Sequence, residues 1–263
     1  MNDRRNSEST TNDTIMRINK FLPRSLKLIV YRFLIFLKLE NIFPKCVKYI
    51  IELEFQKEYV KQFRENIPLW LEHNTKYRYL DEIKKICKIG ANTKILDVGC
   101  GISSILHYID GKRYGIDPLA DEYKKIYSYP TGIKISQGCG EDIPFPNKYF
   151  SIVFCCNVLD HVTNPEKTIG EILRVLAPGG YFVLTVEIFN EKRDRDSAHP
   201  HSFTKADANS LVRRKFKKIF EKQSPMMDID TVLVNNKQVL TLVENKHRTK
   251  ELVLLLKKKV SGV

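Results

Sequence analysis

Short apolar runs alternate with helical or turn-rich segments through the middle of the chain. Each run has the length of a β-strand, and this alternation is typical of an α/β fold with a mainly parallel sheet and helices on both faces. The runs are KILDV at 94–98, RYGI at 113–116, GIKI at 132–135, FSIVFC at 150–155 and YFVLTVE at 181–187.

Helical spacing is found on both sides of these runs. Apolar positions recur at this spacing between residues 76 and 87, and a second helix is predicted from Pro165 to the Pro-Gly-Gly at 178–180. A third helix is expected through Leu211. Two later segments, KFKKIFE at 215–221 and KQVLTLVE at 237–244, are expected to complete the sheet with an antiparallel edge strand.

The two ends of the chain differ from the middle. The polar residues 1–20 predict a disordered lead-in and lack the apolar core of a targeting peptide. We expect a helical extension at 21–75, the main α/β domain at 76–245 and a basic tail at 246–263.

Within the extension, residues 24–40 place basic side chains on one face of a helix that is otherwise broadly apolar. This segment is too short and too charged to span a bilayer. It could instead lie at a membrane interface or pack on the α/β domain or a second subunit.

The formal net charge of +13 is unevenly distributed. Lys and Arg outnumber Asp and Glu by 15 to 9 in residues 1–80 and by 14 to 6 in residues 205–263, whereas the middle is almost neutral. An acidic partner such as anionic lipid fits this excess, although dispersed lysines usually form a solvated face. Charge alone is a weak argument for nucleic acid.

Six cysteines show neither paired metal-ligand spacing nor a secretory context. We therefore expect reduced thiols in a cytoplasmic protein, with peripheral membrane contact as an option, and no structural metal.

Two strand ends carry a candidate ligand-binding motif. The first predicted strand ends in ILDVGCGIS, which contains Asp97, Gly99, Cys100 and Gly101. Glycines there let a ligand approach the backbone at the carboxyl end of a strand. The second strand ends in YGIDP, where Asp117, followed by Pro118, can accept hydrogen bonds from both ribose hydroxyls. Ser104 stands where a dinucleotide-binding loop would have its third glycine, which disfavours a pyrophosphate ligand.

The third motif, QGCGEDIPFPNKYFSIVFCCNVLDHV, is more specific than the two strand-end motifs. It combines, in order, an acidic turn, an apolar segment with two prolines and a buried strand. Asp142, next to Glu141, could accept from an adenine amino group, and Ile143 and Phe145 could flank the ring. Asn157 and Val158 follow the strand. With these motifs, residues 80–205 resemble class I S-adenosylmethionine-dependent methyltransferases, in particular small-molecule enzymes of the ubiquinone and menaquinone biosynthesis type.

The resemblance implies a Rossmann-like fold and S-adenosylmethionine as the cofactor. It implies that Gly99–Gly101 hold the methionine part, that Asp117 binds the ribose and that Asp142 lies by the adenine.

Methylation of nucleic-acid bases at an exocyclic amine would need an (Asp/Asn)-Pro-Pro-aromatic turn, where this chain has Cys-Cys-Asn-Val at 155–158. Cytosine-ring methylation would need a cysteine after proline, and neither Cys155 nor Cys156 follows one.

Histidines near two strand ends are candidates for a general base. His161 follows the fourth strand, and His199 and His201 lie in the long charged loop 190–204, which has the character of a lid. We rank His201 first and His199 second. His161 could equally cap or pack its loop. The two loop histidines lack a complete metal ligand set with Asp194 or Asp196, so we expect no metal.

The sequence therefore predicts methyl transfer to a hydroxyl, or with less support a carbon or amine, of a small molecule, glycan or lipid-linked intermediate. An RNA-directed methyltransferase and a non-catalytic, cofactor-binding regulatory protein are the alternatives.

Overall fold

The computed structural model describes residues 44–193, 199–234, 237–245 and 249–259. The chain divides into two units, residues 1–55 with 196–198 and residues 56–195 with 199–263. Helix α3 (Pro44–Glu65) begins in the first unit and continues into the second. The predicted lead-in, the basic stripe at 24–40 and the acids Asp194 and Asp196 lie outside the described residues.

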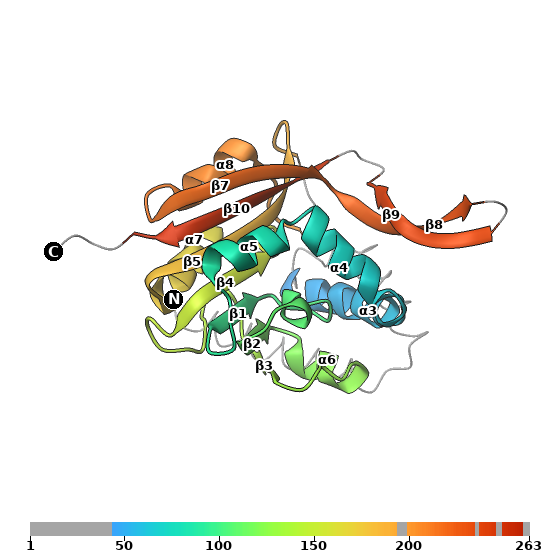
Figure 1. The fold of residues 1–263 in the computed structure, drawn as a ribbon, viewed down its shortest axis with the longest axis horizontal. Coiled ribbons are helices and arrows are strands. Elements are labelled where there is room, and N and C mark those ends of the chain that lie inside the picture. Colours follow the sequence, from blue (N-terminus) through green and yellow to red (C-terminus); the bar gives the residue numbers. More distant parts are fainter. Residues whose placement is uncertain (1–43, 194–198, 235–236, 246–248, 260–263) are drawn as a thin grey trace. The chain divides into compact units, whose positions relative to one another are not determined.

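The second unit is built on a mixed sheet, and all five predicted apolar runs form strands in it. The strand order is β3-β2-β1-β4-β5-β10-β7, with β6 paired to β5 (Figure 1). The strands are β1 (Lys94–Val98), β2 (Lys112–Asp117), β3 (Ile133–Gln137), β4 (Phe150–Cys156), β5 (Leu176–Phe189), β6 (Phe203–Thr204), β7 (Phe216–Pro225) and β10 (Lys250–Lys258).

Strands β3, β2, β1, β4 and β5 run parallel. From β1 the chain moves outward to β2 and β3 and then returns to β4 on the other side of β1. Such a reversal of strand order opens a crevice at the carboxyl ends of β1 and β4, where open α/β sheets bind their ligands.

The carboxyl-terminal segment corrects one expectation. Residues 246–263 were predicted as a basic tail, but Lys250–Lys258 forms β10, which pairs antiparallel with β5 and β7. Its residues 252–256 are apolar and almost completely buried, because β10 lies inside the sheet and not at its edge. Of the two strands predicted to finish the sheet, β7 does so. The other, β9 (Lys237–Glu244), pairs with β8 (Met227–Val234) in a separate two-stranded sheet.

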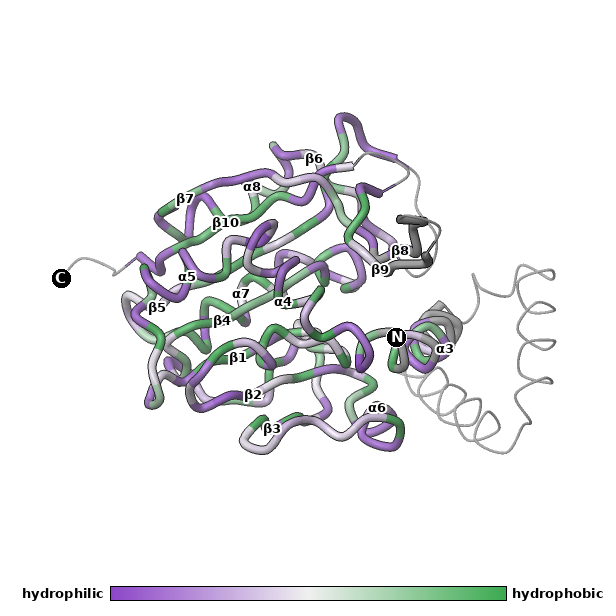
Figure 2. The backbone as a smooth tube through the Cα atoms, turned by 45° about the vertical axis from the view of Figure 1, so that its right-hand side comes forward, coloured by the Kyte–Doolittle hydropathy of each residue, from purple (hydrophilic) through white to green (hydrophobic). Residues whose placement is uncertain are grey.

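Helices cover both faces of the main sheet, as predicted. One apolar core contains residues of α7 (Pro165–Val175) and α8 (Lys205–Val212), and another contains residues of α5 (Leu80–Cys87) and the short 3-10 helix η2 (Ile105–Tyr108). The strands β1, β4 and β10 lie between these two cores and are largely apolar (Figure 2). The remaining helices of the unit are α4 (Ile67–Lys76) and α6 (Ala120–Ile126).

Local capping fixes where α7 and α8 start. The Asn164 side chain accepts from the Lys167 amide, with Pro165 in the first turn of α7. Thr204 and Asp207 form a reciprocal capping box at α8.

A buried ion pair joins β10 to the segment before α5. The Arg78 Nε atom donates to both carboxylate oxygens of Glu251, at 2.9 and 3.1 Å. Glu251 has no exposed surface. Burial by itself raises the pKa of this carboxyl, but the Arg78 guanidinium outweighs burial and holds the pKa below its usual range.

We expect Glu251→Gln to destabilise the protein by about 3–5 kcal/mol in urea unfolding, because it leaves the Arg78 charge buried without its counterion. A paired substitution of Arg78 and Glu251 by leucine should recover most of that loss. The depressed pKa means that this stabilisation is complete above the ordinary glutamate pKa and is lost as pH falls through the lower folded-state value. Equal unfolding curves for the parent and Glu251→Gln would contradict this account.

Candidate active site

The loop after β1 is held against the loop after β4. Gly99 and Gly101 have φ angles of +67° and +50°. A Cβ atom on Gly99 would come within 2.5 Å of the Val158 side chain, whereas one on Gly101 would meet nothing closer than 3.6 Å, in Gln56. The amides of Gly99 and Cys100 both donate to the Ile116 carbonyl, at 2.8 and 3.0 Å. Glycine at 99 is therefore required by both backbone conformation and space.

Asp117 lies beside this loop, at the end of β2. One carboxylate oxygen accepts from the Gly101 amide at 3.1 Å and the other from the Leu119 amide at 2.9 Å. These bonds fix the orientation of the carboxylate, and each oxygen can accept a second hydrogen bond. The position suits the predicted contact with a ribose, and Pro118 begins the turn that leads away from it.

Asp97 supports the loop from within the protein. It is 3% exposed and accepts a 2.6 Å hydrogen bond from the Ser104 hydroxyl, which also caps η2. Burial raises the pKa of Asp97 to about 7, against the opposing effect of the Ser104 bond. Ser104, considered in the sequence only as a missing glycine, thus anchors the loop.

The residues of the acidic turn have separate environments. The Glu141 carboxylate accepts from the amides of Thr163 and Asn164, at 2.6 and 3.2 Å, ahead of α7. Ile143 belongs to the apolar core, and its amide donates to Glu171. The Asp142 side chain is exposed. Of these three predicted cofactor residues, Asp142 has the side chain most accessible to a ligand.

Asn157 and Val158 follow β4 at the crevice. Asn157 has a φ of +53°, and its amide donates to the Thr185 carbonyl at 2.9 Å. Its side-chain oxygen is buried and has no hydrogen-bond partner among the described residues. A buried oxygen without a donor is costly for a protein alone, so this atom fits a site completed by a polar ligand.

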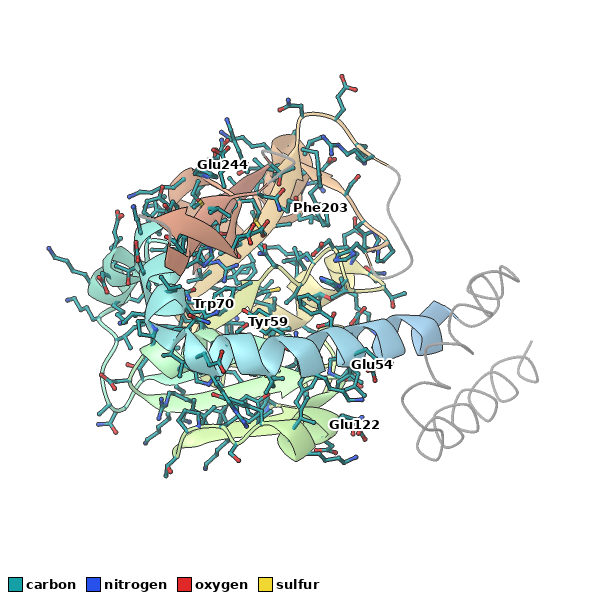
Figure 3. The ribbon with its side chains drawn as sticks, turned by 90° about the vertical axis from the view of Figure 1, so that its right-hand side faces the viewer. Glu54, Tyr59, Trp70, Glu122, Phe203 and Glu244 are labelled. Atoms are coloured by element: carbon teal, nitrogen blue, oxygen red, sulfur yellow. The ribbon has the colours of Figure 1, made fainter. Side chains whose placement is uncertain are left out.

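Residues from α3 and from the segment after α6 also reach the glycine loop. The Tyr129 hydroxyl donates to the Gly101 carbonyl at 2.7 Å, and Tyr59 hydrogen bonds to Ser103. Trp70 lies edge-on to Tyr59, with ring centroids 5.3 Å apart (Figure 3). Tyr79, just before α5, packs against Phe220 of β7 instead.

Helix α4 adds buried polar atoms that the sequence did not single out. Trp70 Nε1 and His73 Nδ1 are buried without a hydrogen-bond partner among the described residues. Burial lowers the pKa of His73 to about 4, so its imidazole is neutral at pH 7. His73 lies on α4, with its ring next to those of Trp70 and Tyr77, and no strand end marks its position in the sequence.

Two of the three candidate histidines meet at the ends of β4 and β5. The ring centroids of His161 and His199 are 4.3 Å apart, and Asp160 Oδ2 lies 4.0 Å from His161 Nε2. One ligand atom from each of these residues lies within 4.8 Å of the others, so a divalent cation is a further group they could hold.

His201 is engaged differently. Its Nε2 atom lies 3.0 Å from the Val162 carbonyl, and its amide donates to the Asp160 carbonyl at 3.4 Å. These two contacts fasten the loop after β5 to the turn after β4.

The parallel sheet, the glycine loop after β1 and the buried acid after β2 define a Rossmann-like domain that binds a nucleoside-containing ligand. Residues 96–184 match a family described as methyltransferase domain.

Uncharacterized protein MJ1123 of Methanocaldococcus jannaschii is 28% identical over 191 residues, covering 68% of this chain and 87% of that protein. Sarcosine/dimethylglycine N-methyltransferase of Aphanothece halophytica is 30% identical over 112 residues, covering 38% and 40%. The crystal structure of a putative methyltransferase from Bacillus halodurans shares the fold with a TM-score of 0.54 and 17% identity, covering 69% of this chain and 99% of the other.

The match over residues 96–184 and the fold identify this part of the chain as a methyltransferase domain of the class I, S-adenosylmethionine-dependent type. Its cofactor is S-adenosylmethionine, which the glycine loop, Asp117 and the buried Asn157 oxygen fit. The finer resemblance to enzymes of ubiquinone and menaquinone biosynthesis stays a prediction. No helix among the described residues is long and apolar enough to cross a bilayer.

We expect Gly99→Ala to weaken binding of S-adenosylmethionine at least about tenfold, because the added methyl group displaces Val158 and strains the loop. Gly170→Ala is the matched control, since a Cβ atom there meets nothing within 4 Å. Calorimetry should show parental affinity in the control. Parental affinity in Gly99→Ala as well would refute the proposed close fit.

Asp117→Ala should weaken both S-adenosylmethionine and S-adenosylhomocysteine. Loss of hydrogen bonds to a charged acceptor, worth about 1.5–3 kcal/mol, corresponds to roughly a ten- to hundredfold rise in Kd. Because the two ligands share the ribose, calorimetry should give similar losses for both. A loss for only one of them would place Asp117 elsewhere in the site.

Proposed function

We propose that this enzyme methylates a hydroxyl oxygen of a small molecule, a glycan or a lipid-linked intermediate. The observation that carries the proposal is the cluster formed by Asp160, His161 and His199 at the ends of β4 and β5. Asp160 and His161 belong to the same turn as Asn157 and Val158, which border the glycine loop, and His199 comes from the loop after β5. A group able to remove a proton is therefore close in the fold to the cofactor crevice.

The reaction divides into a part that the cofactor supplies and a part that the protein supplies. S-adenosylmethionine carries an activated methyl group on a sulfonium. The protein must align the acceptor and exclude water, which can lower the barrier by roughly 7–11 kcal/mol in favourable cases. A neutral hydroxyl is a poor nucleophile, so its proton must also be removed. General-base catalysis typically adds on the order of a hundred- to ten-thousandfold.

The contacts favour His199 and His161 over His201 for this role. The Nε2 atom of His201 is occupied by the Val162 carbonyl, which suits a residue that holds the loop. Asp160 lies beside His161 and can stabilise the imidazolium that forms when a proton arrives. We therefore reverse the order inferred from the sequence and give His201 a positioning role.

An amine acceptor is the second candidate. It is favoured by the 30% identity to a protein named sarcosine/dimethylglycine N-methyltransferase, over 112 residues. An amine with a free lone pair needs less help from a base than a hydroxyl does, so the histidine cluster favours a hydroxyl oxygen as the acceptor atom.

An RNA acceptor would show binding that falls steeply with salt. A regulatory protein without chemistry would bind the cofactor and turn nothing over.

His199→Ala and His161→Ala should each leave the affinity for S-adenosylmethionine nearly unchanged and lower kcat by about a hundredfold or more. His201→Ala should lower kcat less and raise the acceptor KM, because it frees the loop. Turnover within a few-fold of the parent in both His199→Ala and His161→Ala would reject the cluster. Loss of activity on chelation, restored by a divalent cation, would assign the cluster to a metal.

Incubating cell extract with enzyme and a methyl-labelled donor should yield a labelled O-methyl product in mass spectra. The control is Gly99→Ala at a donor concentration below the parental Kd, which should give at least about tenfold less label. A labelled N-methyl product would favour the amine reading, and labelled RNA the nucleic-acid reading.

A further inference from the structure

The amino ends of the parallel strands carry a row of lysines. Lys94 and Lys112 are register partners at the starts of β1 and β2, and Lys134 is the second residue of β3. The glycine loop and Asp117 lie at the opposite ends of these strands. The lysines therefore occupy the edge of the sheet that faces away from the cofactor.

This row continues onto the antiparallel half of the sheet. Because β10 runs against β5, its end at Lys257–Lys258 lies at the same edge as the strand starts. Lys258 is near Lys148, just before β4: burial lowers the pKa of Lys258, and the positive charge of Lys148 lowers it further. Lys257 is the register partner of Lys217 on β7.

Lys259 then extends the row to the end of α8. Its Nζ atom donates to the carbonyls of Arg213 and Arg214, both at 3.3 Å, which brings two further cations to the same corner. We call the lysines at 94, 112, 134, 148, 217 and 257–259 the basic edge.

The exposed Asp110 lies directly before β2, and two further acids near this edge are paired with other cations. Glu171 is bound to Arg174 at 2.7 Å, and Glu221 is bound to Lys205 and Lys218. None of these three cations belongs to the basic edge, so the paired acids do not offset its charge. A concentrated positive field on one side of a protein attracts an extended anionic partner.

We propose that the basic edge docks on an anionic lipid surface. Lysine is a compact point charge suited to the diffuse field of lipid headgroups, whereas a bidentate phosphate site would use arginine forks. The aromatic rings at this edge are also covered. Lys94 Nζ lies 3.9 Å from the Tyr149 ring centroid and Lys257 Nζ 5.4 Å from that of Tyr181, so these faces are not open for nucleotide bases to stack.

This docking orients the enzyme. With the amino ends of the strands on the bilayer, the cofactor crevice at their carboxyl ends faces the aqueous side. The lipid surface then serves as a tether, and the acceptor group approaches from water.

The test is flotation of the full chain with vesicles of phosphatidylcholine alone or with about 30% phosphatidylglycerol. The edge variant combines Lys112→Gln, Lys134→Gln, Lys217→Gln and Lys257→Gln. The matched control combines Lys124→Gln, Lys125→Gln, Lys167→Gln and Lys192→Gln, which are exposed and lie on α6, α7 and the loop after β5. Both variants lose four positive charges, and thermal unfolding checks that both fold.

The parent should float with anionic and not with neutral vesicles, and about 0.5 M salt should release it. The edge variant should partition at least about tenfold more weakly, with the control variant within about twofold of the parent. An equal loss of vesicle binding in the two variants would mean that net charge alone explains the binding, and this would overturn the proposal. Full binding by the edge variant would assign attachment to residues 1–43 and also overturn it, as would retention on single-stranded RNA without vesicle binding.

Discussion

The contact between Gly99 and Val158 is the constraint on which the site depends. It presses the loop after β1 against the loop after β4, with room for a hydrogen atom and none for a methyl group at position 99. The loop thereby directs the Gly101 amide toward the end of β2, where the Asp117 carboxylate accepts a hydrogen bond from it. The geometry of the cofactor crevice follows from this one close approach, because Asp117 is positioned by the loop and Asn157 belongs to the turn that contacts it.

The Arg78–Glu251 pair connects distant parts of the chain to this crevice. Glu251 comes from β10, near the carboxyl terminus, and Arg78 from the segment that follows α4. Arg78 lines a small cavity together with Cys156 and Thr185. Cys156 is the last residue of β4, and Thr185 is its register partner on β5. A buried ion pair adds little net stability over apolar packing, but it is strongly directional. It therefore fixes the segment between α4, which carries Trp70 and His73, and α5 against β10.

The sequence predicts those features whose causes are local. Strand periodicity located β1 to β5, the glycine spacing located the loop, and an acid after the second strand located Asp117. Capping at Thr204 is also a short-range effect.

Expectations that required long-range pairing were less successful. The run Leu252–Leu256 has the apolar density of an inner strand, but its neighbouring lysines suggested a tail, and only pairing with β5 and β7 decides between the two. Gln56 and Tyr129 could not be picked out, because each meets Gly101 across more than twenty residues of sequence. Among the acidic residues of the turn, nothing in the local pattern shows that Glu141 is bound by the amides before α7 while Asp142 stays exposed.

Under the proposed function, the acceptor side is built by the loops after β4 and β5, which are attached to the fold in different ways. His161 belongs to the turn that also holds Val158, so its position follows from the cofactor loop. His199 belongs to a loop attached by His201 to the Val162 and Asp160 carbonyls, which are backbone groups and make no demand on the side chains around them. Substitutions in the second loop can therefore reshape the acceptor side while the contact of Gly99 with Val158 is kept. Under the proposed function, His161 is the fixed part of the histidine cluster and His199 its adaptable part, so we expect the loop after β5 to select the acceptor.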